Sequence, residues 1–169
     1  MTQEQLSENL KSEAIRNGLC QQWQQEWNGA NKQTLITMYL SGIDFCIQNN
    51  YPPLSFIKEN FEKDILHYNS IYVDEQITER NPTTPVVVNG ECHGIMMFDG
   101  CHSATIYVRH SSTLHIEAKG LSKVWVHVYD GAKVNIEQKE GAAVYVYPYG
   151  ENSIVNFVGD VKVRKRKNL

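Results

Sequence analysis

The sequence predicts an α+β fold, with an N-terminal helical region followed by a short parallel β-solenoid, or β-helix. Three observations predict it. Up to residue 68, apolar residues recur at about every fourth position, the spacing of one helix face. Beyond residue 76 they alternate with polar residues, the pattern of strands. These strands recur every ten residues, and an internal repeat of this kind is typical of a solenoid.

Composition and charge narrow the classes of protein. The 169 residues suffice for one ordinary domain or two small ones, and 41% hydrophobic with 21% charged residues is a globular composition. A formal net charge of −3 indicates neither a nucleic-acid-binding nor a membrane-surface protein. No apolar run approaches the roughly 20 residues that span a bilayer. The polar start lacks the apolar segment of a secretory signal, so we expect a cytoplasmic protein whose four cysteines are reduced.

Residues 1–75 are expected to form a helical bundle or cap. Thr2 and Gln5 can form a capping box, and Asn31 can cap a second helix that ends at "NNYPP", because proline cannot continue a helix. A last short helix is expected to start at Ser55. Whether Gly18 divides the first helix is open. The expected buried faces are Leu6, Leu10, Ala14, Leu19, Trp23 and Trp27; Leu35, Met38, Tyr39, Ile43, Cys46 and Ile47; and Phe56, Phe61, Ile65 and Leu66. About 65 residues is near the size at which a lone core becomes marginal, so we expect this region to dock on the solenoid.

Residues 76–164 are expected to form the solenoid. Every tenth position from Val86 to Val146 is apolar, and glycines separate the units. The pairs "NG" and "DG" are typical of two-residue hairpins, which would give an antiparallel meander. Such hairpins switch the buried set between even and odd positions at each turn, whereas here the buried set stays even. A parallel coil keeps this parity. Three-residue bulged loops would also keep it, so a meander remains the alternative.

The length of one coil is left open by this pattern. A flattened coil of two strands takes twenty residues and gives about four coils, and a triangular coil takes thirty. Open solenoid ends expose strand edges, which invite aggregation. We expect the helical region to cap the first coil and the basic tail, residues 165–169, to blunt the last.

Two Cys-His pairs, Cys92-His93 and Cys101-His102, raise the question of a metal site. Zinc sites generally hold ligand pairs two to four residues apart, with a second pair elsewhere, and "CHGIMMFDGCH" lacks this spacing. We interpret the pairs as a repeated corner, in which Cys92 and His102 share the buried parity and could stack together. No metal or other cofactor is therefore expected.

Glu117 and Glu137 lie twenty residues apart on the outward parity. In a twenty-residue coil they would stack at about the 4.8 Å strand spacing, near the separation that a retaining glycosidase needs. The simpler interpretation is a pair of solvated glutamates beside Lys119 and Lys139. The sequence contains no Ser-His-Asp order, phosphate-binding glycine loop or HExxH motif, so we do not expect an enzyme.

The outward positions of alternate units hold an unusual number of aromatic side chains. In a twenty-residue coil they would stack into one aromatic stripe, while the other units would give a polar row. Tyr, Trp and Arg dominate binding hot spots, so the stripe is the predicted binding site. Alternatively, the rings only stabilise the sheet, or the helical region covers them. The aromatic stripe consists of Tyr107, Arg109, Trp125, His127, Tyr129, Tyr145, Tyr147 and Tyr149.

The glycine-spaced strand ladder resembles bacterial β-helical proteins, including the polymer-forming bactofilins, over the second half of the chain only. Bactofilins typically lack a helical half. Most of the chain, through "GIDFCIQNNYPPLSFIKENF", "ATIYVRH" and "VWVHVYDGAKVNI", is similar to small uncharacterised proteins of gut bacteria and their prophages. This resemblance implies a phage or mobile-element origin and carries no functional residue.

The sequence therefore favours a non-catalytic recognition or assembly module. The expected partner is a second copy of the chain or another protein, bound through the aromatic stripe. A glycan-binding or glycan-active β-helix is the alternative, with carbohydrate as the ligand. The tail "KVRKRKNL" could bind phosphates, but a basic end more often only solubilises, so nucleic acid is not the expected partner.

Overall fold

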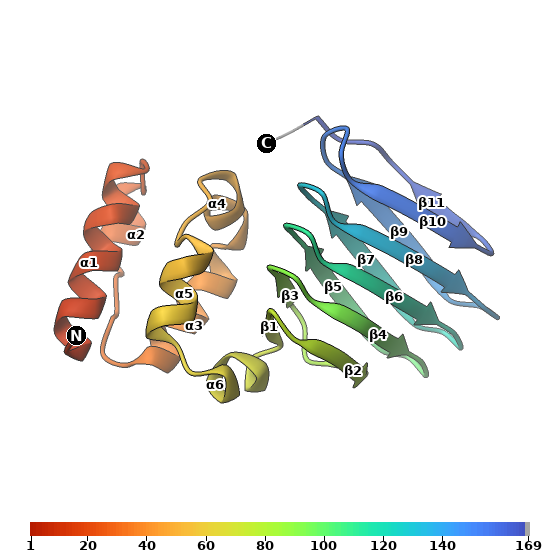
Figure 1. Cartoon of the computed structure of the whole chain (residues 1–169), viewed down its shortest axis with the longest axis horizontal. Helices are drawn as coiled ribbons and strands as arrows, with labels where there is room; N and C mark the ends of the chain where they lie inside the picture. The colour runs from red at the N-terminus through yellow and green to blue at the C-terminus, as the bar shows by residue number, and fades with distance from the viewer. Residues whose placement is uncertain (168–169) are drawn as a thin grey trace. The chain divides into compact units, whose positions relative to one another are not determined.

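The computed structural model describes residues 1–167 and contains two compact units, Met1–Ile65 and the part of the chain from Leu66 onward (Figure 1). The first unit is helical and the second is built around strands. Within residues 1–167 the helices are α1 (Gln3–Arg16), α2 (Gln21–Gln25), α3 (Lys32–Ser41), α4 (Ile43–Gln48), α5 (Leu54–Asn60) and α6 (Lys63–Tyr68). None of them is long and apolar enough to cross a membrane.

The helical unit begins with the expected capping box, in which the Thr2 side chain accepts from the backbone N–H of Gln5. Asn31 caps α3 in the same manner. Six buried residues from α1, α3, α4 and the loop after α4 share an apolar core, and within it the Tyr51 hydroxyl donates a 2.7 Å hydrogen bond to the Leu10 carbonyl. This bond supplies the partner that a buried hydroxyl requires.

The helices are shorter than the apolar spacing predicts. The first predicted helix ends at Arg16, because the chain turns at Gly18, whose φ is +89°, and resumes as α2. The second is divided at Gly42 into α3 and α4. This break decides the question that the sequence left open at Gly18. Leu19 and Trp27 pack against the core as expected, and Trp23 in α2 is half-buried.

The second unit is a parallel β-solenoid, as the sequence predicts. It is two-sided and has about five coils, where a twenty-residue coil was expected to give about four. The chain alternates between two sheets, so odd-numbered strands form sheet A and even-numbered strands form sheet B (Figure 1). All pairings between these strands are parallel, which rules out the meander. The strands are β1 (Ile71–Val73), β2 (Gln76–Arg80), β3 (Val86–Asn89), β4 (His93–Phe98), β5 (Ser103–Val108), β6 (Thr113–Ala118), β7 (Lys123–Val128), β8 (Lys133–Gln138), β9 (Ala143–Pro148), β10 (Ile154–Val158) and β11 (Val161–Val163).

The register settles the coil length at twenty residues in the central part of the solenoid. Ile106 pairs with Val126, which pairs with Val146. The even-numbered side chains point inward and form apolar ladders at almost zero exposure. Because each ladder residue stacks on its equivalent in the next coil, the core is continuous along the solenoid axis.

The Asn-Gly and Asp-Gly pairs lie at the turns between the two sheets and not at hairpins. Several turns place one residue in the left-handed region, including Gly90 at φ +81°, Gly100 at φ +61° and Asp130 at φ +56°. Gly, Asn and Asp adopt this region at low cost, so the same residues that favour hairpins also favour these turns.

The coils at the two ends deviate from the twenty-residue repeat. β1 begins at Ile71, before the expected start of the solenoid at residue 76, and Ile71 pairs with Val87 only sixteen positions later. At the other end Val161 pairs with Val144, seventeen positions earlier. Of the tail, Arg166 forms a parallel bridge with Tyr149, and residues 168–169 lie outside the described part of the chain.

Candidate functional site

The aromatic stripe forms on the outer face of sheet A, because strands β5, β7 and β9 stack its members in register. Tyr107 pairs with His127, which pairs with Tyr147. Their rings are stacked, with centroids 5.0 Å apart at each step. Trp125 and Tyr145 form a neighbouring stack with centroids 6.0 Å apart and ring planes within 12°.

A third stack lies at the turn that follows these strands. Tyr129 and Tyr149 have ring centroids 4.3 Å apart, and the Tyr149 hydroxyl lies 3.1 Å from Nδ1 of His127. This contact links the third stack to the first. The stripe is therefore a fixed surface in which each ring is held by its neighbours along the solenoid axis.

Exposure divides the stripe into two parts. Tyr107, Arg109 and Tyr129 are buried, with exposed fractions of 9%, 4% and 6%. The other residues predicted to bind, Trp125, His127, Tyr145 and Tyr147, are half-buried and retain accessible surface. Only this second part is available to a partner in the structure.

Two cations complete the accessible part of the stripe, and the sequence pattern did not indicate them. The Lys162 ammonium lies 5.3 Å from the Tyr145 ring centroid, and the Arg166 guanidinium carbon lies 5.3 Å from that of Tyr147. Cations at such distances are attracted by the ring faces. They were missed because β11 pairs with β9 out of step with the decameric repeat, so the spacing does not align them with the stripe.

The charge on this face has one sign. The outward positions of β5, β7, β9 and β11 carry no Asp or Glu. They carry aromatic residues together with Lys123 and Lys162, and Arg166 follows β11. The accessible surface of sheet A is therefore aromatic and basic.

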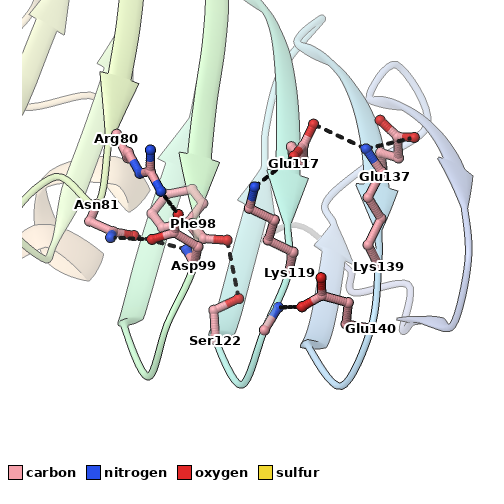
Figure 2. Close-up of polar contacts among 11 residues, drawn as sticks. Arg80, Asn81, Phe98, Asp99, Glu117, Lys119, Ser122, Glu137, Lys139 and Glu140 are labelled. Carbon is pink, nitrogen blue, oxygen red and sulfur yellow. Dashed lines mark hydrogen bonds and ion pairs between the residues drawn. The ribbon is translucent and has the colours of Figure 1, made fainter.

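The two glutamates proposed as a carboxylate pair do stack, on the outer face of sheet B, where Glu117 pairs with Glu137. Figure 2 shows the Lys139 ammonium between them, 3.3 Å from an oxygen of Glu117 and 3.2 Å from one of Glu137. Hydrogen bonds to Glu137 and then to Glu117 raise the pKa of Lys139 above its ordinary value. An ammonium group in this place offsets the like-charge repulsion that helps a glycosidase to keep its acid protonated.

The turns that follow the strands of sheet B hold a row of polar contacts, also visible in Figure 2. Asp99 accepts from the side chains of Asn81 and Arg80, and these hydrogen bonds, that of Asn81 first, hold its pKa below its ordinary value. Two coils further on, Glu140 accepts a 2.7 Å hydrogen bond from the backbone N–H of Gly120. Side chains in this row satisfy backbone groups and one another, which is a structural role.

The Cys-His pairs do not come together. Cys92 is buried at the turn that leads into sheet B, and its Sγ donates to the Asn89 carbonyl at 3.3 Å. His102 lies at the opposite turn, where Nε2 is 3.0 Å from the Pro82 carbonyl. The expected stacking of Cys92 on His102 was wrong, because residues ten apart lie half a coil apart. Within residues 1–167 no three His, Cys, Asp or Glu side chains are grouped so as to hold a metal ion.

Comparison with known proteins adds no relative. No protein-family model matches the chain, and neither a curated protein nor a solved structure matches it. The accessible part of the stripe, together with Lys162 and Arg166, is therefore the candidate binding surface.

Proposed function

We propose that the protein is a non-catalytic recognition module that binds an acidic protein partner through the accessible part of the aromatic stripe. The observation that carries the proposal is the combination of stacked Trp125–Tyr145 and His127–Tyr147 rings with Lys162 and Arg166 above them. Aromatic residues and arginine are the residue types that dominate protein–protein hot spots. Because the rings are already held in place, little side-chain entropy is lost on binding.

The orientation of the rings favours a protein over a carbohydrate. The Tyr145 ring lies between Trp125 and the Lys162 ammonium, and the Tyr147 ring lies between His127 and Arg166. A sugar or a nucleic-acid base stacks on a free ring face, and these faces are occupied. What remains accessible is ring edges, hydroxyl groups and positive charge, which suit carboxylates and apolar side chains of a protein.

Selection from a phage-displayed library of random peptides tests this function even though the partner is unidentified. The wild-type protein should enrich peptides rich in Asp and Glu with a neighbouring aromatic residue. The double variant Trp125→Ala with Tyr145→Ala should lose this enrichment while it keeps the wild-type melting temperature. His115→Ala with Asn135→Ala, two half-buried outward residues of sheet B, is the matched control and should still enrich the same peptides.

Three outcomes contradict the proposal. Equal enrichment by the wild type and the stripe variant would place binding elsewhere. Binding on a glycan array that the stripe variant loses would assign the stripe to carbohydrate. A melting temperature several degrees lower in the stripe variant, with no enriched peptide for the wild type, would mean that the rings serve only to stabilise the sheet.

A further inference from the structure

Within residues 1–167, the last coil of the solenoid leaves the end of the apolar core partly exposed. In β10, Val155 and Phe157 take the inward positions that Val134 and Ile136 occupy one coil earlier. Ile136 is 3% exposed, whereas Phe157 is 47% exposed. In β11, Val161 and Val163 stack in the same way on β9, and Val163 is 37% exposed. We call these four residues, Val155, Phe157, Val161 and Val163, the open end.

The open end also has two free strand edges among the described residues. β10 is the last strand of sheet B and β11 is the last strand of sheet A, so each has a strand neighbour on one side only. An edge of this kind is a template for pairing with another chain. Outward-facing Ile154 and Val158 of β10 add exposed fractions of 49% and 71% to the apolar surface around it.

We propose that the open end is a dimer interface at which two copies of this chain meet end to end about a two-fold axis. A second copy presents the same two strands, so it can extend both sheets and cover both apolar cores at once. This interface lies on the edge strands and adjoins the stripe at Lys162 and Arg166, and the inference goes beyond the recognition function proposed above.

The positions of the charged residues favour one of the two orientations in which a second copy could bind the open end. β10 and β11 run in opposite directions, because the chain turns back at Gly159 and Asp160. A two-fold axis can place β11 of one copy against β10 of the other, or like against like. Pairing β11 with itself would bring Lys162 and Arg164 of both copies together, which is repulsive.

The alternative orientation is complementary. When β11 faces β10 of the other copy in antiparallel fashion, the residues after β11 lie beside the residues before β10. The first segment carries Lys165, Arg166 and Lys167, and the second carries Glu151. In one chain these segments already line a common open hollow at this end of the solenoid. Each basic segment would then approach Glu151 of the partner subunit, twice in the dimer.

Sedimentation or light scattering over a range of protein concentrations measures the proposed association. We expect a reversible dimer for the wild type. Phe157→Lys places a charge in the joined core and should raise the dissociation constant about tenfold or more. Leu121→Lys, at a residue that is 66% exposed on a turn away from the open end, is the matched control and should leave it unchanged.

A mixing experiment tests the orientation and does not depend on the folding of the Phe157 variant. Glu151→Lys gives one chain with two basic segments, and Lys165→Glu with Lys167→Glu gives another with two acidic segments. Each should be monomeric alone, and an equimolar mixture should form a heterodimer, because both contacts between unlike chains are then attractive. A contact within one chain could not be restored by mixing.

The opposite results would overturn the proposal. A wild type that stays monomeric at about 100 μM, an affinity in the range of weak contacts, would mean that the basic residues keep the edge unpaired. A dimer unaffected by Phe157→Lys would place the interface elsewhere. Dissociation by the Trp125 and Tyr145 substitutions would assign self-association to the stripe. Variants that fail to associate on mixing would exclude this orientation.

Discussion

Adding one methyl group to Gly94 should damage the solenoid far more than adding it to Gly100. Both glycines have positive φ, +151° and +61°, so both substitutions to alanine impose an unfavourable backbone conformation. They differ in their surroundings. A Cβ at Gly94 would lie 2.0 Å from the carbonyl oxygen of Ile77 and 2.7 Å from its backbone nitrogen, whereas a Cβ at Gly100 meets no atom within 4 Å.

The magnitudes follow from these contacts. Gly100→Ala bears only the left-handed penalty of about 1–2 kcal/mol, part of which is offset by the lower entropy of the unfolded chain. In Gly94→Ala the clashing atoms are backbone, so β4 must move away from β2. It then loses hydrogen bonds worth about 1 kcal/mol each in addition to core packing, for a total of about 4 kcal/mol. For a chain of this length each kcal/mol lowers the melting temperature by about 2–4 °C.

Thermal unfolding followed by circular dichroism at the strand signal compares the two variants. We expect the melting temperature to fall by about 2–4 °C for Gly100→Ala and by about 8–16 °C for Gly94→Ala. If Gly94→Ala melted within about 3 °C of Gly100→Ala, the close approach of β4 to Ile77 would not be a constraint, and the reasoning would be refuted.

Three further predictions concern single side chains. A thiol reagent should modify the exposed cysteines before the buried ones, because burial removes access and also raises the pKa of the Cys92 thiol; a fast-reacting Cys92 would contradict this. Burial, together with the positive charge of Arg109, lowers the pKa of His110 from its ordinary value of 6.5. Below that pH the unfolded chain binds a proton more readily than the folded chain, so the free energy of unfolding falls as the pH falls. His110→Asn keeps an acceptor for the Gly90 N–H and tolerates φ +59°, so its melting temperature should fall less between pH 7.5 and pH 5, and an equal fall would argue against this role. Lys139→Met should cost less than about 1 kcal/mol in a denaturant titration, because its ion pairs are solvent-exposed.

The solenoid was predictable because its signal is repeated. From Val86 to Val146 the apolar positions that face inward keep one parity over seven units, and a parallel coil does this without exception. The period of ten could not distinguish a two-strand coil from a three-strand coil, because twenty and thirty are both multiples of it. Only the pairing of Ile106 with Val126 decides between them.

The first and last coils depart from the repeat, and their pairing could not be predicted from the sequence. The first coil is shortened, so Ile71 lies out of step with Val87, and β1 falls within the range expected to be helical. β11 is out of step with β9 in the same way, which concealed the positions of Lys162 and Arg166 over the stripe. Burial of Arg109 and Tyr129 could not be read from parity either, since parity tells which face a side chain is on and not what covers that face.

Because of the twenty-residue register, an insertion of twenty residues and an insertion of ten residues would affect the solenoid differently. Inserting or removing a full coil would change its length by one strand spacing, about 4.8 Å, and leave every remaining side chain on its own face. Inserting ten residues would instead exchange the two sheets for everything that follows. Placed before Tyr145, such an insertion would carry Tyr145 and Tyr147 to the face of Glu117 and leave Trp125 and His127 behind. Natural variation in length within this region should therefore occur in multiples of twenty residues if both faces are used.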